Sequence, residues 1–505
     1  MEYHYPKFTP EMKKTHTILI PNMAVTQFRL MEYALRCEGY KCELLGNCGS
    51  AVAQLGLKYV HNDTCYPALL VIGQFLDALN SGKYDLEHTA LLITQTGGGC
   101  RASNYIHLLR KALVKAGYPQ IPVASLNFSG LEKDSGFQMT LPLARKCIAC
   151  IFYGDMLCAL RNQVAPYENE KGAADRMVDR WIARLGRALL AGKGFTSREM
   201  KHTFPLIAKE FATIPVTRAQ GQGGCCGRDL RQVQPAGQQR LAEVSGSQDC
   251  EVNFPGLMGF VQYCAFNMGE DHVLYGGKLA VKVGTDQFLN WLDSVERVML
   301  KAETDAGFYA PGPFKELVKK PKGVISLGAK MGEGWLLTAE MIELVQGGYG
   351  NIVCAQPFGC LPNHIVGKGM VNKIRALYPS ANITPIDYDQ CYPGQSGKPH
   401  QADAGGGQGA AERPRRSPAA YGRAARRRRP SGWRYRVTKA NTIKQGSRCT
   451  AFLRSSSLFA GKEPLWKSPQ LPVIICPACS SFTSCTAAFC RCTGSTGNIF
   501  TIGAP

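Results

Sequence analysis

Four cysteines stand in contexts that could bind a metal. Cys65 lies in NDTCYP directly before a helical pattern, and Cys100 lies in TQTGGGCRASNY between a buried strand and a helix. Cys354 and Cys360 share the motif CAQPFGCLPNH at a strand end. In open α/β sheets ligands collect at the carboxyl ends of the strands, so thiolates from two lobes could converge there on one metal centre. Soft thiolate ligands favour an iron–sulfur cluster or zinc.

Most cysteines in a folded protein are small buried apolar side chains rather than ligands. We assign that role to Cys37, Cys42, Cys48, Cys147, Cys150, Cys158, Cys250 and Cys264. Cys65, Cys100 and Cys360 differ because Gly or Pro flanks each of them and shapes a loop. For these three, residue chemistry alone leaves the ligand role and the core role evenly balanced.

A glycine-rich turn precedes Cys100. Gly97, Gly98 and Gly99 lie at a strand-to-helix junction, where backbone N–H groups could cradle an anion such as a coenzyme phosphate. No Gly-Lys-Ser/Thr follows, so this is not a Walker A loop. The turn could also give access to a cluster, or simply reverse the chain. A second turn, GAKMGEGW, places Glu333 near a helix start, where a carboxylate also caps the helix dipole.

Two weaker features accompany these motifs. His61 and His364 flank the cysteine motifs and could donate to a substrate or cluster, although a lone histidine is more often structural. The CPAC motif at 476–479, with Cys485, Cys490 and Cys492, resembles half of a zinc site and lacks a second CxxC pair.

The elements that must position these residues alternate in type. Strand patterns at 16–23, 42–45, 90–95 and 121–128 alternate with helical patterns at 26–37, 65–82 and 105–118. The alternation recurs with strands at 324–329, 351–358 and 382–389 and helices at 335–345 and 363–377. Such alternation predicts an α/β fold with parallel sheets covered on both faces. We expect two Rossmann-like lobes joined by helices, followed by an irregular C-terminal tail.

The predicted domains follow from these patterns. They are a first α/β lobe (1–140), a helical connection (141–218), an anomalous segment (219–248), a second α/β lobe (249–389) and an irregular basic tail (390–505).

The anomalous segment and the tail lack regular apolar periodicity. Shifted by one base, Gly223–Asp229 can be translated as Val-Gly-Val-Val-Gly-Glu-Ile, a good buried strand where the second lobe should open. His400–Gln408, shifted likewise, can give Ile-Lys-Leu-Met-Leu-Ala-Val-Ala-Lys, a good amphipathic helix. We therefore hypothesise a shifted reading frame at about 218–248 and again after about 389, testable by resequencing the source DNA. The alternative is a genuinely disordered basic tail.

The charge is concentrated in that tail. Residues 391–505 hold 18 of the 59 Lys and Arg and 3 of the 38 Asp and Glu, so they carry +15 of the net charge of +21. The rest has an ordinary balance, and no nucleic-acid partner is expected; a tail that did bind nucleic acid would do so in a strongly salt-dependent way. The N-terminus MEYHYPKFTPEMKK lacks an apolar signal core, and no run of 18 apolar residues predicts a membrane span. Cytoplasm, with thiols reduced or metal-bound, is the expected compartment.

Long motifs resemble a known family. NDTCYPALLVIGQ, LLITQTGGGCRASNYI, GEGWLLTAEMIELV and NIVCAQPFGCLPNHIVGKG are similar to the non-ATPase part of the 2-hydroxyacyl-CoA dehydratase / CoA-substrate-specific enzyme activase family of anaerobic bacteria. The resemblance covers roughly residues 8–218 and 248–389. An actin-like ATPase segment normally precedes this region in the family, so we expect a fragment or a split gene.

The resemblance implies a [4Fe–4S] or double-cubane cluster held by cysteines between two lobes. In that family an ATP-driven activator injects a low-potential electron, which in the true dehydratases reduces a 2-hydroxyacyl-CoA thioester to a ketyl radical that expels the hydroxyl. Cys65, Cys100 and the Cys354/Cys360 pair match the family's cysteine motifs, and we favour Cys360 of that pair as the ligand. The second lobe departs from the family at its opening strand and its end, which puts the activity of this exact chain in doubt.

The expected function is the iron–sulfur component of a reductive dehydratase, a lyase, or of a related low-potential reductase. The alternative is a non-catalytic iron–sulfur or zinc-binding partner that regulates an activase ATPase. An ATP-dependent activator is the expected partner, and the resemblance leaves a CoA thioester and a dimer open. Substrate and cluster nuclearity are not determined, and no residue is assigned as a catalytic acid or base.

Overall fold

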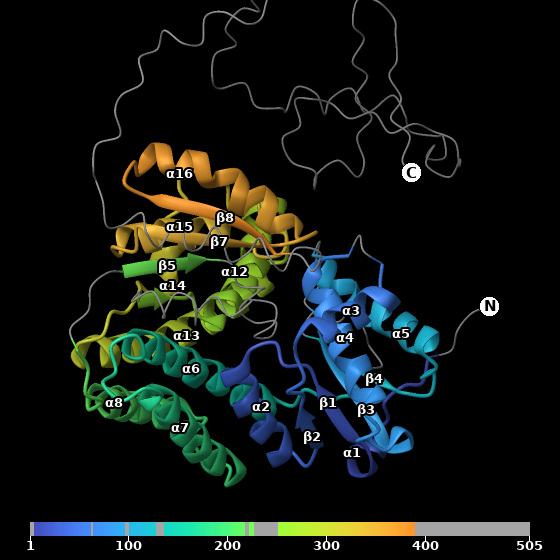
Figure 1. Cartoon of the computed structure of the whole chain (residues 1–505). Coiled ribbons are helices and arrows are strands. Elements are labelled where there is room, and N and C mark those ends of the chain that lie inside the picture. Colours follow the sequence, from blue (N-terminus) through green and yellow to red (C-terminus); the bar gives the residue numbers. More distant parts are fainter. Residues whose placement is uncertain are drawn as a thin grey trace, which may run out of the picture. The chain divides into compact units, whose positions relative to one another are not determined.

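A computed structural model describes residues 5–61, 64–95, 100–127, 136–217, 222–226 and 251–388, and at 222–226 it describes the backbone alone. The described elements belong to one compact unit, residues 1–413. They form two four-stranded parallel sheets with many helices (Figure 1), which confirms the predicted α/β class. The predicted tail, 390–505, and the cysteines in it lie outside the described residues.

The first sheet has the strand order β2-β1-β3-β4, and all neighbouring strands are parallel. Its strands are β1 (Thr17–Ile20), β2 (Lys41–Leu44), β3 (Thr89–Gln95) and β4 (Val123–Asn127). Buried residues fill β3 except at Thr94, as expected for a strand covered on both faces. All four strands of this sheet stand where the apolar runs predicted them.

Helices follow the predicted alternation around this sheet. They are α1 (Met12–Thr15), α2 (Val25–Cys37), α3 (Ser50–Tyr59), α4 (Tyr66–Asn80), the short η1 (Leu86–His88) and η2 (Arg101–Asn104), and α5 (Tyr105–Ala116). The sequence did not predict α3. It packs tightly on α4, and this close approach requires glycine at positions 56 and 73. A Cβ at Gly56 or Gly73 would stand 2.0 Å from a backbone carbonyl oxygen of the other helix.

A helical layer is formed by two stretches of the chain: 141–212 lies between the two sheets in sequence, and 257–317 lies between strands of the second sheet. Its members are α6 (Leu141–Val164), α7 (Ala173–Leu190), α8 (Ser197–Ala212), α12 (Leu257–Tyr275), α13 (Leu279–Asp305) and α14 (Phe314–Leu317). Thr196 and Glu199 form a capping box that fixes the start of α8. Helices α6, α7 and α8 occupy the stretch predicted to be helical, whereas α12 and α13 were not predicted.

The second sheet has the order β6-β5-β7-β8 and is also parallel throughout. Its strands are β5 (Gln222–Cys226), β6 (Glu251–Asn253), β7 (Asn351–Pro357) and β8 (Asn382–Tyr388). The helices α15 (Trp335–Gln346), η3 (Asn363–Gly367), η4 (Lys368–Met370) and α16 (Val371–Leu377) accompany it. The predicted strands at 351–358 and 382–389 and the helix at 335–345 are confirmed over their described residues.

Two sequence predictions in this part are wrong. Residues 324–329 form turns rather than a strand, because Pro321 accepts the N–H groups of Val324 and Ile325 and Gly323 has φ +79°. A short apolar run between turn-forming residues does not identify a strand by itself. The single helix expected at 363–377 is divided into η3, η4 and α16, with a break at Gly367.

The anomalous segment contributes one strand. The backbone of β5 pairs with Glu251–Asn253 on one side and with Ile352–Cys354 on the other. It therefore occupies the inner position where the sequence predicted the opening strand of a second lobe. The reading-frame hypothesis remains a prediction, and residues 227–250, including Cys250, lie outside the described residues.

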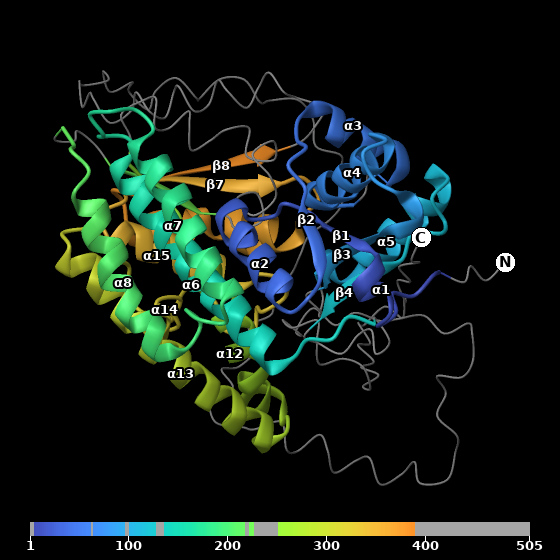
Figure 2. The same cartoon turned by 90° about the horizontal axis from the view of Figure 1, so that it is seen from below.

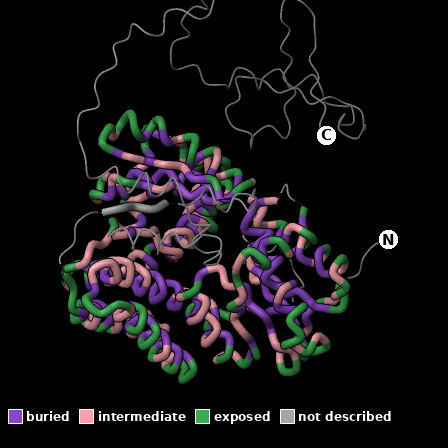
Figure 3. The backbone as a smooth tube through the Cα atoms, in the orientation of Figure 1, coloured by how far each residue is buried: buried purple, intermediate pink, exposed green. Residues whose placement is uncertain are grey.

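The end of the second sheet is directed toward helices of the first, and helices cover both sheets. Figures 1 and 2 both show the carboxyl ends of β7 and β8 directed toward α3 and α4 of the first sheet. Buried residues run along the strands and the inner faces of the helices (Figure 3), and exposed residues gather at turns and outer helix faces. No helix in the described part of the chain combines the length and the apolar character needed to cross a membrane.

Candidate functional site

Three loops meet where the predicted cysteine motifs lie. A Cβ on Gly359 would stand 3.1 Å from the carbonyl oxygen of Thr64, 3.2 Å from the Cα of Cys65 and 3.3 Å from Nη1 of Arg101. Gly359 has φ +71°, a conformation that glycine adopts without strain. The loop after β7 thus lies directly against the start of α4 and against η2, in the space that a side chain at 359 would need.

Cys65 is the N-cap residue of α4 and is buried. Its Sγ lies 2.7 Å from the hydroxyl of Tyr105, the first residue of α5. The N–H of Tyr66 donates to the carbonyl of Phe358 at 2.9 Å, and the N–H of Phe358 donates to Tyr388 at the end of β8. These bonds hold the Cys65 loop against the end of the second sheet.

Cys100 is half-buried and forms the N-cap of η2. Gln95, the last residue of β3, donates from Nε2 to the carbonyl of Ser103 at 2.8 Å and so anchors η2 to the strand. Arg101, next to Cys100, is the residue that approaches Gly359. The predicted anion-binding glycines Gly97, Gly98 and Gly99 lie outside the described residues.

Cys360 is buried and follows Gly359 directly. Nδ2 of Asn363 donates to its Sγ at 3.0 Å, and the N–H of His364 donates to its carbonyl at 3.2 Å. The side chain of Asn363 is fully buried, and its Oδ1 has no hydrogen-bond partner among the described residues. A π-helical turn, η3, presents Asn363, and such turns often occur at functional sites.

Cys354 lies apart from these loops. It stands in the middle of β7, is fully buried and packs with Ile352, Met341 and Ile383. Its strand neighbour Ala355 belongs instead to the cluster that contains Cys65. Because side chains alternate along a strand, Cys354 points to the face of the sheet opposite to that cluster. Its Sγ accepts a hydrogen bond from Gln356 at 2.9 Å.

Other cysteines support the distinction between core thiols and loop thiols. Burial raises the pKa of Cys42 and Cys147 to about 12 and that of Cys150 well above its ordinary value. Neutral thiols of this kind behave as small apolar side chains, as predicted. Cys48 is exposed, so its assignment to the core is wrong. Residues 46–49 (Gly-Asn-Cys-Gly) form a polar loop that offers no apolar surroundings.

The predicted accessory residues have different surroundings. His364 is half-buried, with Nδ1 3.9 Å from an oxygen of Asp387. His61 is exposed at the end of the described segment before Thr64. Glu333 lies near the start of α15, as the sequence indicated, directly before the N-cap Gly334, and its side chain is buried.

The arrangement places the loop that carries Cys360 against the loops that carry Cys65 and Cys100. The hydroxyl of Tyr105 shares a hydrogen bond with the sulfur of Cys65, and Nδ2 of Asn363 donates to the sulfur of Cys360. Arg101 supplies a positive charge beside the loop. Sulfur ligands with neighbouring hydrogen-bond donors suit a thiolate-bound metal. Within the described ranges, no three His, Cys, Asp or Glu side chains are grouped so that they could hold a metal ion.

Sequence reasoning missed several of these residues. Tyr105 was part of an ordinary helical pattern, and Arg101 and Asn363 lay inside the quoted motifs without a role. The only signal for them was their position, one or three residues after a predicted cysteine or at the start of the following helix. No protein-family model matches this chain, and a search of curated proteins found no match.

Proposed function

We propose that this chain is the iron–sulfur-binding component of an ATP-activated 2-hydroxyacyl-CoA dehydratase or a related low-potential reductase. The close approach of Gly359 to Cys65 and Arg101 supports the proposal most directly, because it brings three separate cysteine motifs into contact. The ligands in this proposal are Cys65, Cys100 and Cys360. Cys354, on the other face of β7, has a structural role.

The surrounding residues have positioning roles in this proposal. Asn363 donates to the sulfur of Cys360, and the hydroxyl of Tyr105, which shares a hydrogen bond with the sulfur of Cys65, would donate to a thiolate there. Both bonds would orient the thiolates and tune their electron density. Arg101 offers a charge to an anionic substrate group such as a CoA phosphate. When bound, the cluster would supply a low-potential electron to the substrate.

The same proposal includes the assembly. Each sheet with its helices would be one Rossmann-like lobe, supported by their matching strand orders. The electron would come from an ATP-dependent activator, as a separate segment or subunit. The cytoplasm is the proposed compartment, since thiolate ligands need a reducing environment.

The test is anaerobic purification of the full chain, followed by iron and acid-labile sulfide analysis and EPR after reduction. Cys65→Ala, Cys100→Ala and Cys360→Ala are compared with Cys48→Ala, an exposed cysteine outside the site. The proposal predicts roughly four or eight irons per chain, as cubane-type clusters require, lost in the three site variants and kept in the control. A parallel chain with the frame at 219–247 restored separates a binding defect from incomplete folding.

Zinc in place of iron, or iron that remains in all three site variants, would contradict the proposal and favour the regulatory alternative. If the cluster is present, addition of a 2-hydroxyacyl-CoA thioester tests whether the protein binds this substrate. A change in the EPR spectrum on addition supports a substrate-binding enzyme, whereas an unchanged spectrum favours a non-catalytic partner of the ATPase.

A further inference from the structure

A cavity that none of the candidate cysteines lines lies between α6, α12, α13 and α15. It has a volume of about 120 Å³ and is bordered along one side by β6 and the following residues. Apolar side chains such as Phe152, Met258 and Leu300 form much of its wall. One water molecule needs only about 10–15 Å³ of such space, so the cavity has room for a small organic molecule.

The polar part of the wall is acidic. Its carboxyl groups belong to Asp155, Glu296, Glu303, Glu340 and Glu343, and no Lys, Arg or His is among the described residues that line the cavity. Two of these groups are stabilised by other parts of the protein. Asp155 accepts the N–H groups of Leu257 and Met258, and Glu343 pairs with Lys320 at 2.8 Å.

Glu303 is different because it is 1% exposed and its Oε1 has no hydrogen-bond partner among the described residues. Gln262, also 1% exposed and on the cavity wall, has an Oε1 without a partner in the same described part. Leaving a buried acceptor without a hydrogen-bond donor is unfavourable. Two buried acceptors facing one cavity therefore call for a ligand that donates hydrogen bonds.

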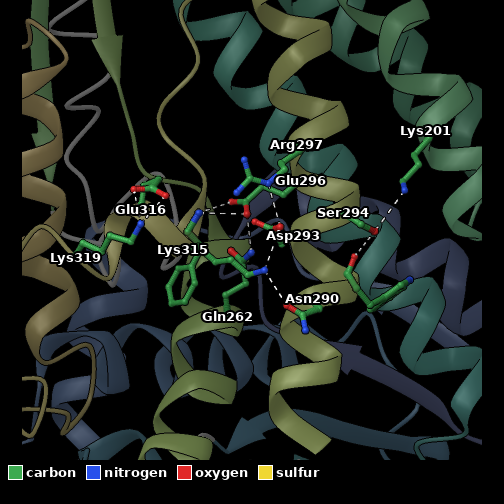
Figure 4. A network of polar contacts seen from close by, with 12 residues as sticks. Lys201, Gln262, Asn290, Asp293, Ser294, Glu296, Arg297, Lys315, Glu316 and Lys319 are labelled. Carbon is green, nitrogen blue, oxygen red and sulfur yellow. Dashed lines mark hydrogen bonds and ion pairs between the residues drawn. The ribbon is translucent and has the colours of Figure 1, made fainter. Parts of the chain in front are cut away.

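The basic residues nearby are engaged outside the cavity. Figure 4 shows Arg297 and Lys315 paired with Asp293, at 3.0 and 3.3 Å. Glu296, on the cavity side, accepts instead from Nε2 of Gln262 at 2.9 Å and from the N–H of Phe314. Arg297 and Lys315 are thus paired with Asp293, which does not line the cavity, rather than with Glu303.

We propose that this cavity binds a small primary alkylammonium ion, with the ammonium group donating to Glu303 and Gln262 and the alkyl chain lying against the apolar wall. An ammonium ion has three donors and one positive charge, which matches two unpaired acceptors in an acidic surrounding. A metal ion suits the cavity less well, since no three acidic or other ligand side chains of the described residues are grouped to hold one.

Burial and the neighbouring Asp155 raise the pKa of Glu303 to about 8. At pH 7 Glu303 is therefore mainly the neutral carboxylic acid when no cation lies beside it. An ammonium ion favours the carboxylate, so binding should release protons to the solvent. The other titratable groups facing the cavity are Asp155, Glu296, Glu340, Glu343 and Tyr309.

The test is calorimetric titration of the full chain with butylammonium chloride at pH 7, in two buffers of different ionisation enthalpy. The proposal predicts saturable binding with net proton release, at least tenfold weaker binding of 1-butanol, and no competing binding of Mg²⁺. Glu303→Gln should weaken butylammonium binding at least tenfold. Asp305→Asn, an exposed carboxylate two residues further on, should leave it unchanged.

Equal binding of butanol, preference for Mg²⁺, or undiminished binding in Glu303→Gln would overturn the proposal. Circular dichroism checks that Glu303→Gln is folded. Should it not fold, Ala159→Leu decides, because Ala159 lines the cavity and a larger side chain excludes the ligand without removing a carboxylate. Butylammonium binding that persists in Ala159→Leu would place the ligand elsewhere.

Discussion

The two sheets share one topology and differ in what surrounds them. Each has its four strands in the chain order second-first-third-fourth, as β2-β1-β3-β4 and β6-β5-β7-β8. In each, a cysteine follows the third strand: Cys100 after β3 and Cys360 after β7. The first sheet opens with Thr17–Ile20, an apolar strand with three buried residues, whereas the second opens with Gln222–Cys226 and borders an acidic cavity. The strand order and a cysteine after the third strand are thus common to both sheets, while the packing is specific to each sheet.

The strongest test of the repeat compares cysteines at equivalent and non-equivalent positions. Under the proposed iron–sulfur function, Cys100→Ala and Cys360→Ala should each remove essentially all bound iron, because each removes a proposed thiolate ligand. Cys354→Ala, within β7, should retain it. Iron analysis of anaerobic protein measures this, and equal iron loss from all three would remove the distinction between the two faces of β7.

The acidic cavity beside the second sheet predicts a pH dependence of stability. Burial, with Asp155 adding repulsion, raises the pKa of Glu303 to about 8, and burial raises that of Glu296 to about 7. A carboxyl whose pKa rises on folding stabilises the protein fully below its ordinary value of about 4.5 and loses that contribution as the pH rises through 7 to 8. The free energy of unfolding should therefore fall between pH 5 and 8.

Glu303→Gln should flatten this profile and gain on the order of a few kcal/mol at pH 8 relative to the parent chain. Urea unfolding followed by tryptophan fluorescence at pH 5 and 8 measures the difference. Asp305→Asn on the same helix serves as the control. A parallel pH profile for Glu303→Gln and the parent chain would show that Glu303 ionises in the same way folded and unfolded.

Gly359 lies where the loops of the two sheets touch. Gly359→Ala introduces a Cβ 3.1–3.3 Å from three atoms of the first sheet's loops, at φ +71°. Gly82→Ala is a matched control, since Gly82 has φ +69° and open space around it. In the control, the free energy of unfolding should fall by about 1 kcal/mol because of backbone strain alone. In Gly359→Ala the free energy of unfolding should fall by about 1–2 kcal/mol more, because of overpacking. Under the proposed function this variant should also bind less iron. Equal losses in unfolding experiments would mean that the loops adjust freely.

The smallest effect is expected in β5. Replacing Gly223→Val, Cys225→Val and Cys226→Val gives the second sheet an opening strand like that of the first. Because β5 pairs on both sides, β-branched residues should stabilise the chain by about 1–2 kcal/mol. A higher thermal midpoint would support the reading-frame hypothesis, and a lower one would show that the present residues suit their surroundings.

The spacing of apolar residues predicted the helices and strands well where the patterned segment was long or strongly apolar. The run ALLITQ and the helix YIHLLRKALVKA were identified because burial on both faces and a 3.6-residue period leave few alternatives. The same reasoning failed at Val324–Ala329, where Pro321 and Gly323 impose turns on an apolar run. It also gave no expectation for α13, in which polar residues interrupt the apolar ones over a long span.

The sequence indicated the candidate cysteines of the site, but not the contacts that these cysteines make. The flanking Gly and Pro identified Cys65, Cys100 and Cys360, but nothing in the sequence placed Tyr105 at 2.7 Å from the sulfur of Cys65. The acidic cavity was not predicted at all. Its carboxyl groups lie on α6, α13 and α15, far apart in sequence, where each one alone looks like an ordinary polar position.

The sequence by itself determined the α/β alternation and the loops that carry the cysteines, because these depend on periodicity and on the backbone preferences of Gly and Pro. Only the tertiary structure decided which thiols share a face, which glycine permits the loops to touch and which carboxyl groups lose their water. Those properties depend on contacts between distant segments, and burial changes the energy of a charge only once those segments have packed.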